Sequence, residues 1–485
     1  MALQIFDTLT REKREFVPLE EGTIKFYHCG PTVYWTQQIG NMRAMVLADL
    51  IRRTLGYLGY DVNFVRNYTD VGHLTGDNLG DADTGEDRME QGAKREGLSP
   101  KEIADKYIAI FEKDVERLNV LSPNHTPRAT EYIQQIIDMI QVLLDKGFAY
   151  QTEKAIYFDI SKAKDYNKLN KQNMEENREG AGSGDVSDPN KKNPQDFALW
   201  FFKTGVHANA LQTWDSPFGD SLPAGRQGFP GWHIECSAMI KTLLGDTIDL
   251  HMGGVEHIPI HHTNEIAQSE SANGVEFVKY WLHNEHLLVD NKKMAKSEGT
   301  SYSLDDVIEK DLPAGRQGFD PIALRYFFLQ SHYRSRQNFT WEGLKGAATA
   351  YKRLQTTVYG LRQEGGEASE SGNVIEFKRR FVEALEDDFN VPYALGILWD
   401  EVRSTIPSPE KLSLILDFNR VLGLEFKKPT RDIELPQFLQ DLISDRDEAR
   451  KNIDWAKSDE LRQKIEDAGY GVKDTSTGTA VNKKN

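Results

Sequence analysis

Cysteine is almost absent from this chain of 485 residues, which contains only Cys29 and Cys236. The two lie far apart in the sequence and could form at most one disulfide, which a reducing cytoplasm disfavours. No apolar stretch approaches the roughly 18 residues that a membrane-spanning helix requires. The first residues also lack the basic-then-apolar order of a secretory signal. We therefore expect a cytoplasmic protein whose cysteines bind a metal, serve in catalysis or are simply buried.

Positive charge is also scarce, because 59 Lys and Arg against 75 Asp and Glu leave a net charge of −16. This balance excludes a protein that coats nucleic acid without specificity, since phosphate binding relies on Lys and Arg. Local basic clusters remain at 352–362, 378–380 and 446–464. Acidic residues are interleaved with most of them, so solvated helix faces explain each cluster equally well.

The first part of the chain has the order of a nucleotide-binding α/β sheet. A β-rich run from Ile24 to Cys29 is followed by a turn containing Gly and Pro, and then by helical periodicity over 45–58. A second β-rich run over 61–68 completes a βαβ unit. Ligands of parallel sheets bind at the carboxyl ends of strands, where Cys29 and Thr69 are both expected.

The rest of the chain alternates polar stretches with helical patterns. Polar composition predicts a loop over 77–97 and an exposed loop over 171–193 that decorates an inserted domain. Helical periodicity is present over 101–118 and 131–146. The final stretch, 470–485, is small and polar, so we expect it to fray.

An octapeptide, Leu-Pro-Ala-Gly-Arg-Gln-Gly-Phe, occurs twice, at Leu222–Phe229 and Leu312–Phe319. Its Pro and Gly content predicts a surface loop in each copy, and loops of this kind tolerate insertion at small entropic cost. The first copy lies shortly before Trp232. We expect it to bulge outward, with Arg226 outside any functional site.

A metal site is one interpretation of the histidine-rich segment. His261 and Glu265 are four residues apart and therefore share one face of a helix. Cys29 and Cys236 could complete a tetrahedral set of two thiolates, one imidazole and one carboxylate. Distant cysteines have no spacing signature, however, so core histidines, a helix cap and two buried thiols explain the same residues.

Two further segments have features of phosphate-binding loops. The run Lys292–Ser297 could close flexible ammonium groups and a hydroxyl over a polyphosphate. The turn from Gly30 to Asn41 exposes backbone N–H groups and a helix N-terminus. A solvated basic turn and an ordinary structural turn are the respective alternatives.

These segments resemble the signature motifs of cysteinyl-tRNA synthetases. The run Cys29–Tyr34 with Gln38–Asn41 resembles their HIGH region, and Lys293–Ser297 resembles their KMSKS loop. Other segments similar to the family are Lys192–Trp200, Gly231–Cys236, His251–Gly254, His261–Glu265, Asp387–Asn390 and Ala449–Lys451. The resemblance spans nearly the whole chain, and its motifs follow the order of the family.

The resemblance implies an α/β fold with a Rossmann-type parallel-sheet catalytic domain, an inserted connective domain and a helical C-terminal region. The expected boundaries are 1–120 with 225–285 for the catalytic domain, 121–224 for the connective domain, 286–348 for a KMSKS-bearing linker domain, 349–430 for a helical bundle on the anticodon-binding side, and 431–485 for a small tRNA-binding domain.

The implied activity is that of a cysteine–tRNA ligase, which activates L-cysteine with ATP to cysteinyl-adenylate and pyrophosphate and then transfers cysteine to the 3′ end of tRNA(Cys). The implied partners are tRNA(Cys), L-cysteine and ATP with Mg²⁺, for a monomer that acts away from membranes. One zinc ion per chain would be held by Cys29, Cys236, His261 and Glu265. The implied catalytic residues are Lys296, Lys293 and Gln38; those for ATP are Gly40, Asn41, Lys293, Lys296 and Ser297; those for the amino acid are Thr32, Thr69, Trp232 and His251.

The sequence also departs from the family. Gln38 stands where the HIGH signature opens with histidine, and an amide cannot carry the positive charge of that ring. Ala295 replaces the first serine of KMSKS. His73 stands where an acidic residue is expected. We interpret it as a solvent-exposed loop histidine, and the alternative is a residue on the ATP side or in the third shell of the site. The alternative functions are a ligase joining cysteine to an amino sugar and a non-catalytic, synthetase-like RNA-binding protein.

Overall fold

The computed structural model describes residues 2–74, 86–171, 188–220, 225–294, 299–309, 318–368, 371–427, 437–452, 454–475 and 478–483. The chain forms two compact units, residues 1–427 and residues 428–485, and each is described by itself. Among the described helices, none is both long and apolar enough to cross a membrane.

A four-stranded parallel sheet forms the centre of the first unit, in the order β11-β10-β3-β4. Its strands are β3 (Thr23–His28), β4 (Asp61–Arg66), β10 (Ile248–Gly254) and β11 (Val278–Asn284). The intervening helices are α1 (Ile39–Tyr57), α6 (Trp232–Leu244) and α7 (His261–Asn273). The central strand β10 is buried along its whole length, as expected for a parallel strand covered on both faces. This sheet confirms the predicted α/β class.

Helix α1 begins earlier than the periodicity indicated. It starts at Ile39, so Gly40 and Asn41 lie in its first turn, and the predicted turn from Gly30 to Asn41 is wrong at its end. A backbone bond from the Ile39 N–H to the Tyr302 carbonyl fixes this start, at 2.8 Å. Hydrophobic periodicity could not indicate this start, because it is fixed by a contact with a segment distant in sequence.

Part of the loop predicted over 77–97 is a helix, α2 (Arg88–Glu96). The Asp87 carboxylate accepts from two backbone N–H groups at its start, and Gly97 ends it in the left-handed conformation. Residues 75–85 lie outside the described residues. The two helices predicted next are confirmed as α3 (Pro100–Arg117) and α4 (Ile133–Asp145).

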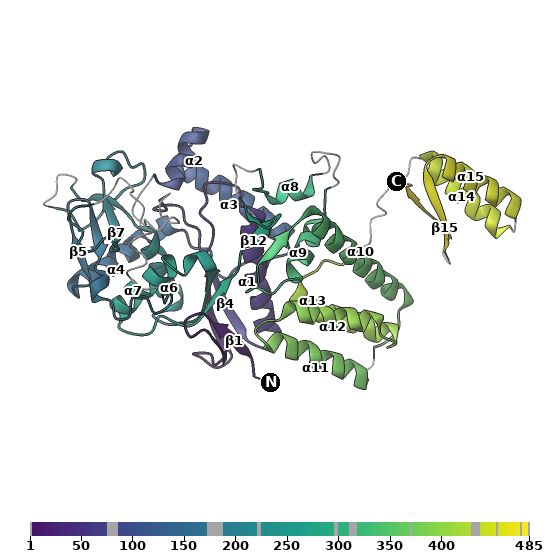
Figure 1. Ribbon diagram of the computed structural model, residues 1–485, viewed down its shortest axis with the longest axis horizontal. Helices are drawn as coiled ribbons and strands as arrows, with labels where there is room; N and C mark the ends of the chain where they lie inside the picture. Colours follow the sequence, from purple (N-terminus) through teal and green to yellow (C-terminus); the bar gives the residue numbers. More distant parts are fainter. Residues whose placement is uncertain are drawn as a thin grey trace. The chain divides into compact units, whose positions relative to one another are not determined.

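An antiparallel five-stranded sheet, in the order β5-β6-β7-β9-β8, is inserted between β4 and β10. Its strands are β5 (Ala149–Gln151), β6 (Ala155–Phe158), β7 (Phe197–Phe202), β8 (Trp214–Asp215) and β9 (Gln227–Pro230). In Figure 1 this sheet and the later helical bundle lie on opposite sides of the segment that holds α1 and β4.

The first octapeptide copy is not wholly a surface loop. Its last residues belong to β9, where Phe229 is buried against Phe201 at 5.1 Å between ring centroids. Residues 221–224 lie outside the described residues. Arg226 is half-exposed and donates to the Ser216 carbonyl, away from the cavity described below, as expected. Most of the second copy, 312–317, also lies outside the described residues.

A small three-stranded sheet precedes the helical region. It consists of β12 (Leu287–Val289), β13 (Lys292–Lys293) and β14 (Gln337–Phe339), with α8 (Leu304–Ile308) and α9 (Pro321–Leu329) between the last two. An N-terminal hairpin of β1 (Gln4–Asp7) and β2 (Glu12–Glu15) is the other short sheet of this unit. Short 3-10 turns occur at Ala129–Tyr132, Ile160–Lys162, Gly205–His207 and Val255–His257.

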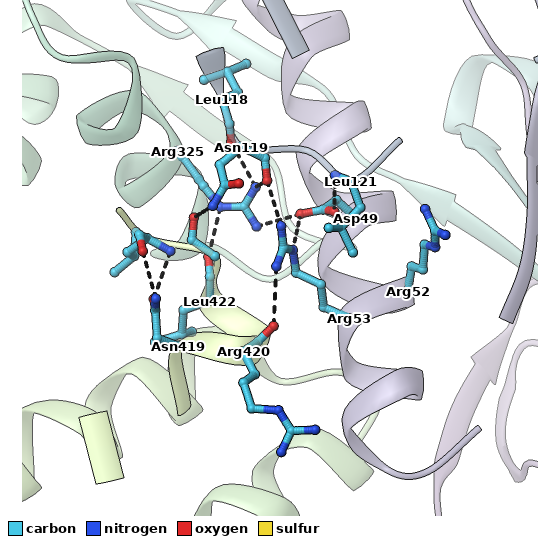
Figure 2. A network of polar contacts seen from close by, with 12 residues as sticks. Asp49, Arg52, Arg53, Leu118, Asn119, Leu121, Arg325, Asn419, Arg420 and Leu422 are labelled. Carbon is cyan, nitrogen blue, oxygen red and sulfur yellow. Dashed lines mark hydrogen bonds and ion pairs between the residues drawn. The ribbon is translucent and has the colours of Figure 1, made fainter. Parts of the chain in front are cut away.

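Four helices form the bundle of the first unit: α10 (Trp341–Glu364), α11 (Gly372–Glu386), α12 (Val391–Arg403) and α13 (Ser408–Leu422). A buried ionic network joins them to α1 (Figure 2). Arg325 of α9 binds Asp49 of α1 at 2.6 Å and the Leu422 carbonyl at 2.8 Å. Arg53 binds the same Asp49 carboxylate oxygen at 2.7 Å. The bundle is thereby fixed to α1, and the N-terminus of the same helix lies at the cavity described below.

The second unit contains two helices and a hairpin: α14 (Gln437–Lys451), α15 (Trp455–Asp467), β15 (Tyr470–Thr475) and β16 (Gly478–Lys483). The expectation that 470–485 frays is wrong for the described part of this stretch, because Tyr470 pairs with Lys483 and the antiparallel ladder runs to the pair Thr475–Gly478. Polar composition did not reveal this hairpin, whose strands satisfy each other's backbone groups.

Candidate functional site

A cavity of about 420 Å³ opens at the carboxyl ends of β3, β4 and β10, beside the start of α1. This is the edge at which ligands of parallel sheets bind. Close backbone approaches shape it: a Cβ on Gly30 would lie 1.7 Å from the Asn67 carbonyl oxygen. The Thr32–Thr69 bridge extends the pairing of β3 and β4 beyond the strand ends. The cavity thus has walls fixed by backbone contacts.

The four predicted metal ligands converge at one end of this cavity. Their ligand atoms all lie within 4.8 Å of one another, and all four residues, Cys29, Cys236, His261 and Glu265, are buried. Cys29 follows β3, Cys236 is on α6, and the other two are one turn apart on α7. All but Glu265 line the cavity itself. A second candidate set in the described residues replaces Cys236 and His261 with His251 and His262.

A layer of histidines orients these side chains. His233 Nδ1 lies 2.9 Å from His261 Nδ1, which leaves Nε2 of His261 facing Glu265 at 2.8 Å. His251 Nε2 lies 2.8 Å from the other Glu265 oxygen. His262 Nε2 lies 3.4 Å from Cys29 Sγ. Such second contacts fix the tautomer and direction of metal-binding groups.

The electrostatics of the cluster suit a cation. Burial by itself raises the pKa of Glu265, but His251 and His261 lower it to about 2. Burial lowers the pKa of His261, yet the Glu265 and Cys236 side chains raise it to about 10. A hydrogen bond from Cys29 lowers the pKa of Cys236 to about 6. A buried thiolate and carboxylate need a compensating positive charge, so the donor set fits a thiophilic divalent metal such as zinc.

The opposite end of the cavity contains the residues expected for ATP. Gly40, Asn41, Gln38 and Lys293 all line it. The Gln38 side chain is not a helix cap and instead donates to Ser301 Oγ at 2.6 Å. A Cβ on Gly40 would lie 2.4 Å from Met294 Cε, so the chain after β13 lies directly on the start of α1. Lys296 and Ser297 lie outside the described residues.

The residues expected for the amino acid occupy different depths. Thr32, Thr69 and Trp232 line the cavity between the metal cluster and α1. His251 is fully buried beneath the cluster and is not among the lining residues. Its contact is with Glu265, which favours a role in orienting that carboxylate.

Sequence reasoning missed two residues that shape this cavity. Gln37 donates to the Thr32 and Trp35 carbonyls at 3.1 Å and accepts from Asn41. Asn67 accepts from the Gly30 N–H at 2.8 Å. His73, which we interpreted as solvent-exposed, is buried and lines the cavity, so that interpretation was wrong. Asn67 and His73 depend on contacts with segments distant in sequence, whereas the bonds of Gln37 given above are all to residues within five positions of it. Of the three, only His73 was marked out, by its unexpected residue type.

Comparisons with known proteins agree with this arrangement. The profile of the family described as tRNA synthetases class I (C) catalytic domain matches residues 15–349. Cysteine–tRNA ligase 1 of Burkholderia lata is 40% identical over 482 residues, which cover 99% of this chain and 96% of that protein. Cysteine–tRNA ligase of Treponema denticola is 37% identical over 513 residues, covering 100% of both chains.

A solved structure of Mycobacterium tuberculosis methionyl-tRNA synthetase bound by methionyl-adenylate covers 83% of this chain and 90% of that chain, with a TM-score of 0.54. At 14% identity this likeness shows the fold alone. The family profile and the full-length relatives show more: the chain belongs to the cysteine–tRNA ligase family of class I tRNA synthetases.

Proposed function

We propose that this ligase activates L-cysteine with ATP and loads it onto tRNA(Cys), and that it recognises the substrate thiol through one zinc ion. The observation that carries the proposal is the convergence of four buried ligand atoms, from two cysteines, a histidine and a glutamate, at one end of the cavity. Full-length relatives named as cysteine–tRNA ligases support the reaction. The match to these relatives covers 99% and 100% of this chain, and so includes its C-terminal unit. It therefore does not favour the amino-sugar ligase or the non-catalytic alternative.

The residues Cys29, Cys236, His261 and Glu265 would hold the metal. A bound zinc ion would favour a soft thiolate over the hydroxyl of serine, a distinction that an apolar pocket makes only weakly. Three formal negative charges among the protein ligands moderate the Lewis acidity of the ion, which suits recognition more than hydrolysis. His233 and His251 would keep His261 and Glu265 in their binding orientation.

The main-chain ends of the amino acid would lie against Thr32 and Thr69. Their backbones are paired with each other, so their hydroxyl groups have fixed positions relative to the metal cluster. Trp232 would form the wall beside the substrate side chain. This arrangement places the α-carboxylate toward the start of α1, where the ATP phosphates are expected.

Adenylate formation is largely a problem of stabilising charge on phosphate oxygens. Gln38, Gly40, Asn41 and Lys293 lie at the phosphate end of the cavity, and the first turn of α1 contributes the positive end of its dipole. We propose that Lys293, Lys296 and Ser297 close over the phosphates, with Mg²⁺ bound by ATP. The amide of Gln38 would act mainly by tethering the segment that ends at Ser301.

Cysteine-dependent exchange of pyrophosphate into ATP tests the proposal. Purified protein should carry close to one zinc ion per chain. It should catalyse pyrophosphate exchange in the presence of cysteine but not of serine. Removing the metal with a chelator should abolish exchange, and zinc should restore it. Exchange that is absent in folded, zinc-loaded protein, or equal with serine, would contradict the proposal. We also propose that the protein is cytoplasmic and monomeric. Light scattering of the purified protein measures its molar mass and so checks the monomer.

A further inference from the structure

His73 is a buried residue of the cavity that the proposed function leaves without a role. It follows β4 in the loop that starts at Thr69, and its side chain is 6% exposed. Burial and the nearby Arg88 guanidinium keep its pKa well below the usual value for histidine, so its ring is neutral at pH 7. A neutral ring in this position acts through packing and hydrogen bonding, not through charge.

The His73 ring stacks on Trp232, with centroids 4.1 Å apart and planes 7° apart. The His261 ring stacks on the same indole, also at 4.1 Å. Two rings cannot both stack at that distance on one face of an indole without overlapping, so they cover opposite faces. Trp232 is therefore held between His73 and a proposed metal ligand, and only its edges are available to the cavity.

The same imidazole also fixes a hydroxyl group. His73 Nδ1 lies 2.5 Å from Thr32 Oγ1. This bond fixes the position of Thr32 Oγ1, and it also directs the hydroxyl hydrogen when the neutral ring accepts at Nδ1. His73 thus contacts two of the residues expected for the amino acid, Trp232 by stacking and Thr32 by hydrogen bonding.

The backbone around His73 leaves it little freedom to move away. Gly72 has a φ of +71°, and a Cβ there would lie 2.4 Å from the Pro230 carbonyl oxygen and 2.9 Å from Glu235 Oε1. The loop therefore packs directly on the segment that carries Trp232. On the other side, the Arg88 N–H donates to the His73 carbonyl at 3.1 Å.

We propose that His73 is a positioning and specificity-determining residue for the amino acid. It holds the Trp232 indole against His261 and orients Thr32, and together these contacts fix the distance from the proposed metal cluster to the far wall of the pocket. That distance selects a thiol amino acid with the short side chain of cysteine over one with an additional methylene group. The inference rests on the proposed function.

Two variants separate the stacking from the hydrogen bond. His73→Asn keeps a polar group near the position of Nδ1 but removes the stack, whereas His73→Phe keeps an aromatic stack and removes the bond to Thr32. We expect His73→Asn to raise the KM for cysteine at least tenfold in pyrophosphate exchange and to lower the preference for cysteine over homocysteine at least tenfold. We expect His73→Phe to raise the KM for cysteine while keeping most of that preference.

Three readouts distinguish this role from a general structural one. The KM for ATP and the zinc content should stay within twofold of wild type in both variants. Tryptophan emission should change when His73→Asn is made in the wild-type chain, but not when it is made in a chain that already carries Trp232→Phe. His125, an exposed histidine outside the cavity, provides matched controls as His125→Asn and His125→Phe.

The inference would be overturned by a KM for cysteine and a homocysteine preference that stay within twofold of wild type in folded His73→Asn. A parallel rise in the KM for ATP, or loss of zinc, would overturn it as well, because the defect would then be general. Wild-type protein that fails to exchange with cysteine would overturn the proposed function and this inference with it.

Discussion

Cys29 and Cys236 have the same side chain and lie in one cluster, yet their thiols differ. Burial raises the pKa of Cys29, whereas a hydrogen bond from Cys29 lowers the pKa of Cys236 to about 6. Near neutral pH, Cys236 is therefore the thiolate of the pair and Cys29 the donor. A metal that enters the cluster would displace the remaining thiol proton, so binding should release protons to the solvent.

Glu265 is the residue whose replacement tests the metal site most directly. Glu265→Gln keeps the size of the side chain but removes the negative charge that faces both His251 and His261. We expect zinc content to fall at least tenfold, because a neutral amide is a much weaker ligand. Atomic absorption on dialysed protein measures it.

Glu276→Gln is the matched control, since Glu276 is exposed and its carboxylate pairs with the half-exposed Lys279 at the surface. It should retain wild-type zinc. Equal zinc in Glu265→Gln and in wild type would contradict the assignment of Glu265 as a ligand.

Residue types predicted a metal set whose four side chains converge in the structure, but the surroundings of each proposed ligand could not be predicted. Two cysteines, an i,i+4 pair and a family resemblance were enough to select Cys29, Cys236, His261 and Glu265. The burial of His73 could not be read in the same way, because it depends on Trp232 and Thr32, which lie in other segments. Lone polar residues in loops have no periodicity that would reveal such contacts.

At the scale of elements, the joint between α1, α9 and α13 is the most ionic part of the core. Arg325 and Asp49 are both fully buried, and the Arg325 guanidinium also binds the Leu118 and Leu422 carbonyls. Arg325→Met would remove one ion pair of Asp49 and three guanidinium–carbonyl hydrogen bonds. Asp49 would keep its bonds to the Arg53 side chain and the Leu121 N–H. We expect a loss of about 3–5 kcal/mol in unfolding free energy, seen in circular dichroism as a melting temperature about 10 °C lower.

Arg403→Met provides the comparison, because Arg403 is exposed and pairs with exposed Asp400. It should cost less than about 1 kcal/mol. Similar melting temperatures for the two variants would show that the buried network contributes little to the joint.

The bundle also contains a buried carboxyl group. Glu401 of α12 is 0% exposed, neither of its side-chain oxygens has a hydrogen-bond partner among the described residues, and burial raises its pKa from 4.5 to about 8. Between these two values the folded chain holds a proton that the unfolded chain has lost. The stability of the bundle therefore falls as pH rises from about 4.5 to about 8.

Glu401→Gln removes this dependence. We expect its melting temperature to exceed that of wild type by about 5 °C at pH 8 and to match it near pH 4.5. Glu367→Gln, at an exposed position, should behave like wild type at both pH values. A difference between Glu401→Gln and wild type that is the same at pH 4.5 and pH 8 would exclude titration of Glu401 as its cause.

Long elements with strong periodicity could be predicted, whereas short elements fixed by caps or by pairing could not. Helices α3 and α4 agree closely with the predicted ranges. Helix α2 was hidden in a polar stretch whose only signals were Asp87 and Gly97. The hairpin of β15 and β16 was missed because small polar residues gave no alternation, and its stability comes from pairing between the strands.

At the scale of the whole molecule, the two compact units divide the work that we propose. Every residue that lines the cavity belongs to residues 1–427. A chain that ends at Lys427 should therefore retain cysteine-dependent pyrophosphate exchange within about twofold of the full chain.

Charging of tRNA should respond differently to this truncation. Removing 428–485 deletes the basic residues of α14 and α15, which we propose contact tRNA phosphates. We expect the kcat/KM for tRNA to fall at least tenfold, and the salt dependence of charging to become weaker. Equal losses in exchange and charging would contradict this division of roles.

The order in which the metal ligands occur along the chain also matters during synthesis. Cys29 leaves the ribosome first, whereas Glu265 follows 236 residues later (265 − 29). At typical elongation rates this interval lasts roughly 12 to 47 s. For most of this interval β3 lacks its neighbour β10, and Cys236, the next proposed ligand along the chain, follows Cys29 only after 207 residues (236 − 29). If these residues hold the metal as we propose, the site is complete only late in synthesis, and until then Cys29 must stay a reduced thiol in the nascent chain.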